Sequence, residues 1–444
     1  MMEKIKRIVE KYKTLITDAY DYIWANPETG YREVKTSKYL EDKFESLGYE
    51  LIKAEDVPGF YTVLDTGRPG PEVLILGEMD ALICPAHAEA DPETGAVHCC
   101  GHAAQSAALL GIAAALKEPE ILDGLSGRIR LCAVPAEELI EIEYRLDLRK
   151  QGKIRYLGGK TEFLYRGYFD DADIALMVHV GVDKSAFVRK GTVGLLAKRA
   201  IYKGQSAHAG GSPWMGRNAL YAANLGLSAI NSIRETFKEA DLIRVHPIIT
   251  QGGNAVNAIP DKVVVESYVR GKELDVIYET NQRVNRALCG GALSLGVNLE
   301  ITDTPGYAPL MNDEKLVDIA IEAWPLSSEK ECERRPIGTG STDFGDLSCL
   351  IPSVHPYVPG AIGKSHGSDY YIEDSEFTCL TSTIWQVRIL TMLLGEGAKK
   401  AYEVIDNFKP LFPSKKAYFE SINRFDSDSE RIEYNENGDA IVHL

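Results

Sequence analysis

The chain has 444 residues, and this length favours two domains of ordinary size over a single small one. Its contents of 45% hydrophobic and 26% charged residues are those of a soluble globular protein. The net charge of −16 argues against nucleic acid or an anionic membrane as a partner, because both bind a basic protein face.

The N-terminal segment contains no apolar signal core, and no apolar run in the chain looks long enough to span a bilayer. The eight cysteines are scattered, and several lie inside apolar runs, as Cys132 does in residues 131–134. This distribution is typical of reduced thiols and not of a disulfide framework. We therefore expect a cytoplasmic protein without a membrane partner.

The first half of the chain alternates predicted helices with short apolar runs. Helices are predicted over residues 3–25, 36–47 and, after His102, through 107–113. Continuous apolar runs, typical of parallel strands buried on both faces, lie at 73–76, 129–134 and 174–178. Sites in open α/β sheets gather at the carboxyl ends of strands, and these three ends lead into Asp80, Glu138 and His179.

Near residue 190 the pattern changes to strands with period-two alternation. Strands are predicted at 195–202, 243–250, 262–270 and 297–303, and helices at 218–234 and 274–288. This order indicates an inserted α+β unit of the βαββαβ, ferredoxin-like kind. The helix at 218–234 carries one apolar stripe, formed by Leu220, Ala223, Leu227 and Ile230.

Beyond residue 303 the chain returns to the style of its first half, with helices predicted at 314–324 and 377–394. We predict an α/β fold whose larger domain is a mixed, largely parallel sheet with helices on both faces. The larger domain is discontinuous and comprises residues 1–188 and 304–405. The inserted smaller domain comprises residues 189–303, and residues 406–444 form a C-terminal extension.

Candidate metal ligands recur where predicted strands end or turns begin. Cys100 and His102 flank one glycine, which lets both side chains turn toward one centre, and Glu138, His179 and His366 follow downstream. A lone Cys-x-His is more often structural, but a thiolate, imidazoles and a carboxylate together suit zinc or manganese. Five protein ligands are too many for one open catalytic zinc, so the set favours two metal ions that share a water.

Glu137 is the neighbour of the candidate ligand Glu138 and is not itself needed as a ligand. Because this region is rich in Glu, the simplest interpretation of the pair is a solvated acidic turn. However, the pair directly follows a buried strand, and a spare carboxylate next to a metal can deprotonate a metal-bound water.

Two polar residues of the inserted domain have both a structural and a functional interpretation. His208 is either a surface histidine or, between small residues, a hydrogen-bond donor to a developing oxyanion. Arg270 at a strand end is either solvated or, if it faces a cleft, suited to a substrate carboxylate. The segment 158–161 resembles the end of a phosphate-binding loop, but Ile154 stands where the first glycine is needed.

Together these motifs resemble the dinuclear metallopeptidases and amidohydrolases that include aminoacylase, carboxypeptidase G and the hippurate and auxin-conjugate hydrolases. Within that family, the pattern is most similar to the p-aminobenzoyl-glutamate hydrolase branch. The resemblance runs from Ile23 to Leu394, and it is carried by residues 26–30, 77–82, 100–102, 137–138, 179, 207–208, 257–260 and 341–344.

The resemblance implies a zinc-exopeptidase type of catalytic domain and an inserted lid or dimerisation domain. It implies two divalent ions, zinc or manganese, held by Cys100, His102, Glu138, His179 and His366. Glu137 would be the general base, Asp80 would position the metal site, and His208 would polarise the scissile carbonyl across a dimer interface. Asn257 and Arg270 would hold the carboxylate of the substrate.

The implied reaction is hydrolysis of the amide bond between an acyl or aroyl group and a free amino acid, with p-aminobenzoyl-glutamate as one type of substrate. Ala103 and Gln105 depart from the family pattern, which often has an acid and a second histidine there. Two alternatives stay open: a dipeptidase or aminopeptidase on the same scaffold, and a catalytically weakened relative that serves only for binding. The expected assembly is a homodimer, or a hetero-oligomer with a related chain.

Overall fold

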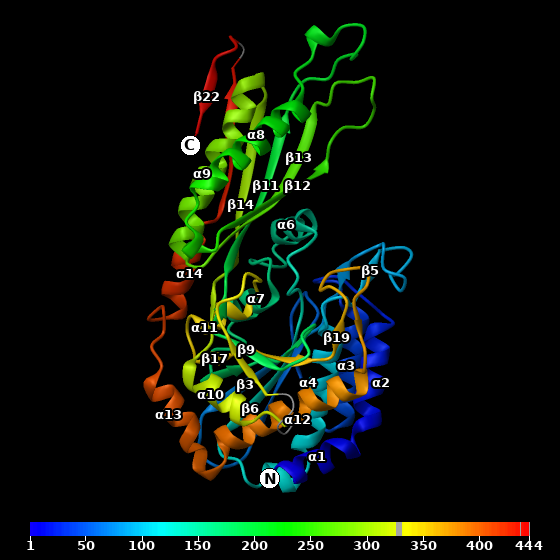
Figure 1. The fold of residues 1–444 in the computed structure, drawn as a ribbon, viewed down its shortest axis with the longest axis vertical. Helices are drawn as coiled ribbons and strands as arrows, with labels where there is room; N and C mark the ends of the chain where they lie inside the picture. Colours follow the sequence, from blue (N-terminus) through cyan, green and yellow to red (C-terminus); the bar gives the residue numbers. More distant parts are fainter. Residues whose placement is uncertain (326–330, 436, 444) are drawn as a thin grey trace. The chain divides into compact units, whose positions relative to one another are not determined.

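The computed structural model describes residues 1–325, 331–435 and 437–443 (Figure 1). The chain forms two compact units. Unit 1 comprises residues 1–192, 310–338 and 342–413, and unit 2 comprises residues 193–309, 339–341 and 414–444. Residues 414–444, which lie in the expected C-terminal extension, thus pack within unit 2.

A six-stranded sheet forms the centre of unit 1. Its order is β1 (Ile52–Lys53), β2 (Phe60–Asp65), β6 (Arg128–Val134), β3 (Glu72–Glu78), β7 (Ile174–Leu176) and β17 (Ser353–Val354). The strand β3 runs parallel to both of its neighbours, whereas β2 runs antiparallel to β6. Every residue of β3 is buried, so both faces of this strand are covered. The predicted mixed, largely parallel sheet is confirmed.

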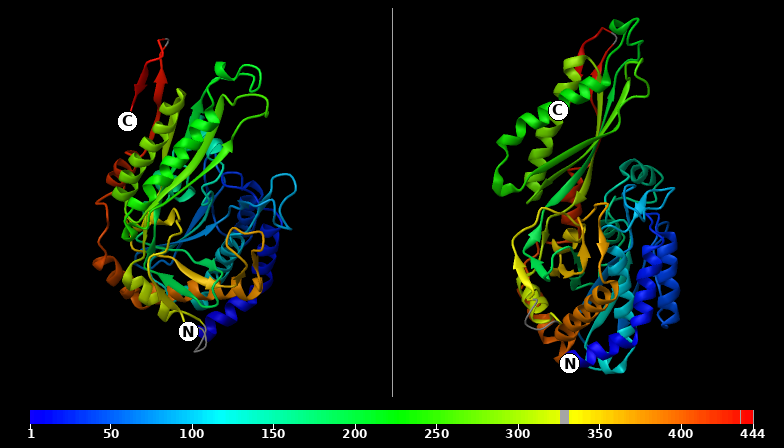
Figure 2. Two further views of the ribbon diagram at one scale, coloured as in Figure 1. Left: turned by 45° about the horizontal axis from the view of Figure 1, so that its top comes forward. Right: turned by 45° about the vertical axis from the view of Figure 1, so that its right-hand side comes forward.

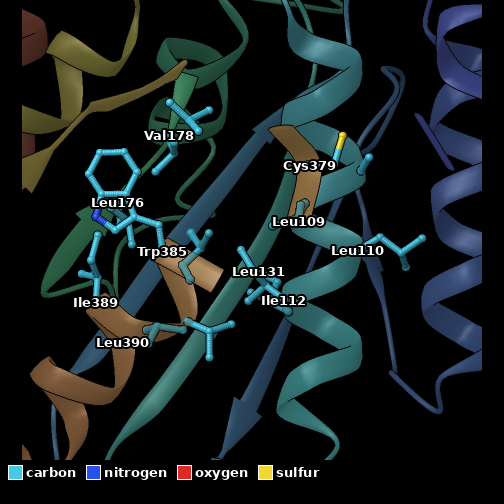
Figure 3. Packing of buried hydrophobic residues seen from close by; sticks show 14 of the residues in the cluster. Leu109, Leu110, Ile112, Leu131, Leu176, Val178, Cys379, Trp385, Ile389 and Leu390 are labelled. Atoms are coloured by element: carbon cyan, nitrogen blue, oxygen red, sulfur yellow. The ribbon is translucent and has the colours of Figure 1, made fainter. Parts of the chain in front are cut away.

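Helices cover this sheet. The N-terminal ones are α1 (Met2–Lys11), α2 (Lys13–Trp24) and α3 (Val34–Ser46), so the single helix predicted for residues 3–25 is interrupted at Tyr12. All residues of α4 (His102–Leu116) are buried, and this Ala-rich helix packs against β3, α2 and α12 (Ser375–Leu394). Figure 3 shows Leu109 and Ile112 of α4 in the same core as Trp385 and Leu390 of α12.

The helix α12 corrects one expectation from the sequence. Within the described residues, it is long and apolar enough to cross a membrane by length and composition. However, 72% of its apolar window is buried inside the protein, and Trp385 donates a hydrogen bond to the carbonyl of Ala320. Packing as a core helix therefore explains why α12 is so apolar.

The remaining elements of unit 1 connect these layers. They include α5 (Pro119–Leu122), α6 (Ile142–Lys150), α7 (Gly159–Tyr165), β8 (His179–Gly181), β9 (Phe187–Arg189), α10 (Glu314–Glu322), β16 (Glu333–Arg335), α11 (Phe344–Ser348), β18 (Pro356–Pro359) and α13 (Lys399–Asn407). Three short strand pairs complete the unit: β4 (Leu82–Ile83) with β5 (Ala96–Val97), β10 (Gly191–Thr192) with β15 (Leu310–Met311), and β19 (Ala361–Ile362) with β20 (Tyr371–Ile372). The segment that resembles a phosphate-binding loop is the start of the buried helix α7.

Unit 2 is built on a second six-stranded sheet in which all neighbours are antiparallel. Its order is β12 (Arg244–Gln251), β13 (Lys262–Gly271), β11 (Gly194–Lys203), β14 (Asn298–Tyr307), β21 (Ser427–Tyr434) and β22 (Ala440–Val442). The helices α8 (Ala219–Ile233) and α9 (Leu274–Leu295) lie on one face of this sheet (Figure 2). The chain order β11, α8, β12, β13, α9, β14 is the predicted βαββαβ order.

The helix α8 and the C-terminal strands differ from what the sequence suggested. Of the predicted apolar stripe, Ala223 and Ile230 are buried in the core of unit 2, whereas Leu220 and Leu227 are half-buried. On α8, Tyr221 is 63% exposed and Leu225 is 41% exposed. The strand β21 pairs with β14, which is how the charged C-terminal residues join the sheet.

Candidate active site

The predicted site residues of unit 1 follow the ends of buried elements. Asp80 comes two residues after the end of β3, Glu138 follows β6, His179 opens β8 and His102 opens α4. Gly101, between Cys100 and His102, has a φ of 111°, a left-handed conformation that favours glycine. A Cβ atom there would lie 2.8 Å from the hydroxyl of Tyr370, so glycine is also needed for close packing.

Two groups of candidate ligand atoms share one cysteine. Cys100, His102 and His179 offer atoms within 4.8 Å of one another, and so do Cys100, Glu138 and His366. Cys100 Sγ lies 3.4 Å from His179 Nε2, and Glu138 Oε1 lies 3.2 Å from His366 Nε2. The structure therefore brings together all five residues that the sequence singled out as ligands.

Glu137 belongs to a third group, together with Glu78 and His102. His102 Nε2 lies 3.9 Å from Glu137 Oε2 and 3.2 Å from Glu78 Oε2. Sequence reasoning missed Glu78 as a site residue, although it lies in the family-like segment 77–82 at the end of β3. A carboxylate at the carboxyl end of a buried parallel strand was the signal that could have identified it.

Asp80 orients the groups around it. His102 Nδ1 lies 2.9 Å from the carbonyl oxygen and 3.1 Å from Oδ1 of Asp80, while Asp80 Oδ2 accepts a hydrogen bond of 2.7 Å from the backbone N–H of Glu138. His179 Nδ1 similarly lies 2.7 Å from the carbonyl oxygen of Val180. When each Nδ1 carries the proton, the Nε2 atom of each ring faces the group as an acceptor.

One buried atom in these groups in particular fits a metal ion. His102 Nε2 forms no hydrogen bond with any residue that the structure describes. An unpaired buried polar atom typically costs about 1–3 kcal/mol, which a bound cation would remove. Sulfur, imidazole nitrogen and carboxylate oxygen are donors that suit a divalent transition metal. His366 is held here with a φ of 64°, a conformation uncommon for residues other than glycine.

The electrostatic environments of these groups differ. Burial raises the pKa of Glu137, and the nearby Glu78 and Glu138 raise it further. Burial also opposes ionisation of Glu138, but the His366 ring outweighs it and lowers the pKa of Glu138 to about 2. Burial and Glu138 raise the pKa of the Cys100 thiol, yet the His102 and His179 rings lower it to about 6.

Three residues of unit 2 were also predicted to serve the site. His208 is exposed, and its Nδ1 accepts hydrogen bonds from the backbone N–H groups of Gly210 and Gly211 at 3.1 and 2.9 Å. The proton of a neutral His208 ring is therefore on Nε2, which is the donor that an oxyanion needs. A hydrogen bond of 2.9 Å from Ala209 N to the carbonyl of Asn257 brings His208 close to Asn257 in the chain fold.

Arg270 lies in β13, the strand that follows the segment with Asn257. The segment with Asn257 precedes Lys262, the first residue of β13, and Arg270 is near the end of that strand. Eight residues of extended strand span about 26 Å. Arg270 thus lies far along β13 from the segment that contains Asn257.

Comparison with known proteins shows the family to which this chain belongs. A family model described as peptidase family M20/M25/M40 matches residues 74–386. The chain is 29% identical over 313 residues to one component chain of p-aminobenzoyl-glutamate hydrolase from Escherichia coli (strain K12), covering 67% of this chain and 60% of that protein. It is 27% identical over 371 residues to hippurate hydrolase of Campylobacter jejuni, covering 80% and 89%. It is 26% identical over 372 residues to Xaa-Arg dipeptidase of Mus musculus, covering 78% and 77%.

Solved structures share the fold. A dinuclear metal-binding peptidase of the M20 family from Bacillus subtilis matches with a TM-score of 0.63 and 19% identity, covering 87% of this chain and 99% of that one. An aminobenzoyl-glutamate utilization protein from Klebsiella pneumoniae matches with a TM-score of 0.66 and 19% identity, covering 89% and 99%. Because the family model matches more than half of the chain, this protein belongs to peptidase family M20/M25/M40 and is a hydrolytic enzyme.

Proposed function

We propose that the protein is a metal-dependent amidohydrolase that cleaves the amide bond between an acyl or aroyl group and a free amino acid. The observation that carries the proposal is the arrangement of two ligand groups that share Cys100 and adjoin the buried carboxyl group of Glu137. The proposed ligands of two divalent ions, zinc or manganese, are Cys100, His102, Glu138, His179 and His366. Asp80 would act as a positioning residue, because it contacts His102 and the backbone of Glu138.

When bound, the ions supply Lewis-acid chemistry, which polarises the scissile carbonyl and lowers the pKa of the attacking water. Glu137 takes a proton from that water and delivers it to the leaving amine. Glu137 is placed for both steps, because its Oε2 lies 3.9 Å from the candidate ligand atom His102 Nε2. The Nε2–H group of His208 donates to the oxyanion that forms on the carbonyl oxygen.

The assembly that we propose is a dimer with shared sites. Arg270 and the pair formed by His208 and Asn257 lie at opposite ends of β13. A site built from two chains would let Arg270 of one chain and Asn257 of its partner contact the same carboxylate. We further propose a cytoplasmic location, and we keep a hetero-oligomer with a related chain as the second form of assembly.

The substrate class is supported by the names of two relatives, which are a p-aminobenzoyl-glutamate hydrolase and a hippurate hydrolase. Both names denote amides between an aroyl group and a free amino acid. A dipeptidase is the second candidate, because another relative is an Xaa-Arg dipeptidase. The two candidates differ at the substrate's N-terminal side, which is acylated in the first and a free amine in the second.

A substrate screen on the metal-loaded enzyme tests these candidates. Matched pairs such as N-benzoyl-glycine and glycyl-glycine, or N-acetyl-arginine and lysyl-arginine, would be compared with zinc and with manganese. We expect turnover of the acylated member of each pair and no turnover after chelation. A consistent preference for the free amine would select the dipeptidase, and full activity in metal-free protein would contradict both candidates.

A further inference from the structure

Three charged side chains are buried together beside the candidate metal site. The ammonium nitrogen of Lys160 lies 2.5 Å from Glu78 Oε1 and 2.5 Å from Asp343 Oδ1, and these side chains are at most 1% exposed. The backbone N–H of Lys160 also donates to Asp343 Oδ2 at 2.8 Å. Moving charges out of water is costly, so a buried ion pair rarely stabilises a fold better than apolar side chains of similar size. These groups therefore call for a functional explanation.

Glu78 is the member of this network that reaches the site. Its Oε1 atom is paired with Lys160, and its Oε2 atom accepts a hydrogen bond of 2.7 Å from Gln105 Nε2. Each carboxylate oxygen of Glu78 thus has an ionic or hydrogen-bonding partner in this network. Two carboxylates and one ammonium group leave one excess negative charge, which favours a cation on the open side of Glu78.

Besides Lys160 and Gln105, Glu78 lies next to His102. Glu78 Oε2 lies 3.2 Å from His102 Nε2, yet His102 Nε2 is buried and forms no hydrogen bond with any described residue. Together with Glu137, the two residues form one group whose candidate ligand atoms lie within 4.8 Å of one another, so one cation can contact both. Two ligand atoms about 2.1 Å from a tetrahedral ion lie roughly 3.4 Å apart, which is close to the observed separation.

We propose that Glu78 is a further ligand of the metal ion that His102 holds, and that Lys160 and Gln105 are positioning residues for Glu78. The inference rests on the proposed metal-dependent function. It gives Gln105 a role of its own: where the family often has a second histidine, this chain has an amide that orients a carboxylate. It also explains why a lysine lies fully buried at the start of α7.

The test measures metal binding, because activity alone would not separate ligation from catalysis. Ions per chain and their affinities are determined by elemental analysis and chelator competition for wild type and Glu78→Gln. We expect two ions in wild type, and in Glu78→Gln one ion bound as before and the other at least ~10-fold more weakly, since even groups behind the ligands contribute ~10–100-fold.

Glu72→Gln is the matched control. Glu72 opens β3 as Glu78 closes it, is 1% exposed, and its Oε1 lies 2.5 Å from Arg130 Nε. This variant loses a buried ion pair at the far end of the strand, so we expect a lower Tm with two ions retained at wild-type affinity. Equal metal loss in both variants would show a general effect of destabilisation and would overturn the proposal.

Glu78→Asp separates ligation from charge and serves also if Glu78→Gln does not fold. The shorter side chain keeps the charge beside Lys160 but withdraws the oxygens from His102, so we expect weakened binding of the same ion. Wild-type affinity in Glu78→Asp would overturn ligation by Glu78. A wild-type protein that binds no metal would instead contradict the proposed function itself.

Discussion

At the scale of single residues, Glu137 and Glu138 show how neighbours in sequence acquire different chemistry. The Glu138 carboxylate lies beside the His366 ring, which holds its pKa at about 2. The Glu137 carboxyl group is buried near two other carboxylates, and both burial and these charges raise its pKa. The first environment suits a permanently ionised ligand, and the second suits a group that exchanges protons.

Replacing each of these residues by Gln should separate the two roles. Glu137→Gln should keep the metals while kcat falls by ~10²–10⁴-fold, because an amide cannot accept the proton. Glu138→Gln should lose metal, because a charged ligand becomes neutral. Metal content and kcat of the two purified variants check this prediction, and identical behaviour of the pair would contradict our assignment of roles.

Arg270 gives a prediction about substrate charge. Its guanidinium would contribute to binding only if the substrate carries a carboxylate at that position. Arg270→Ala should therefore raise KM steeply for N-acyl amino acids and change it little for the corresponding amino-acid amides. The KM values for one acid and amide pair suffice as the measurement. Similar losses for both would mean that Arg270 has a structural role.

At the scale of elements, two adjacent glycines of α9 have different surroundings. A Cβ atom at Gly291 would lie 2.4 Å from the carbonyl oxygen of Ala222 and 2.5 Å from the backbone nitrogen of Gly226, both in α8. A Cβ atom at Gly290 would meet no described atom within 4 Å. Gly291 thus permits the close packing of α8 on α9, whereas Gly290 has no such role.

Alanine at each position should shift stability in opposite directions. Gly290→Ala should stabilise the protein by about 1 kcal/mol, because alanine has the higher helix propensity. Gly291→Ala should destabilise it by roughly 1–3 kcal/mol, because the backbone of α8 must move. Urea unfolding of both variants is the measurement. Stabilisation by both would show that the two helices can separate at no cost.

At the scale of the whole molecule, the geometry of β13 bears on assembly. His208 and Asn257 precede this strand and Arg270 lies near its end, so we expect a second chain to complete the set of three residues around one small substrate. His208→Ala should therefore lose ~10²–10³-fold in kcat with its metals intact, because the oxyanion loses a donor.

Mixing two inactive variants tests the shared site directly. His208→Ala and Glu137→Gln are each expected to be nearly inactive alone. In a mixed dimer, one site would combine Glu137 from one chain with His208 from the other, so part of the activity should return. Native mass spectrometry would verify that the chains exchange between dimers. Exchange without recovered activity would mean that His208 acts within its own chain or has no part in the reaction.

The sequence by itself determined the family, the buried strands β3, β6 and β7, the order of elements from β11 to β14, and the five candidate ligands. Buried parallel strands are recognisable as continuous apolar runs, and the polar residues that follow them, such as Glu138 and His179, necessarily meet at one edge of the sheet. The alternation of period two likewise indicated the strands of unit 2. These are local patterns, which depend on residues close together in the chain.

Only the tertiary structure decided how distant residues combine. Glu78, Lys160 and Asp343 come from three separate segments, and no local pattern could pair them, because their contact follows from how β3, α7 and α11 pack. The charged residues near the C-terminus looked like a tail, yet backbone hydrogen bonding to the exposed edge of β14 turns them into a strand.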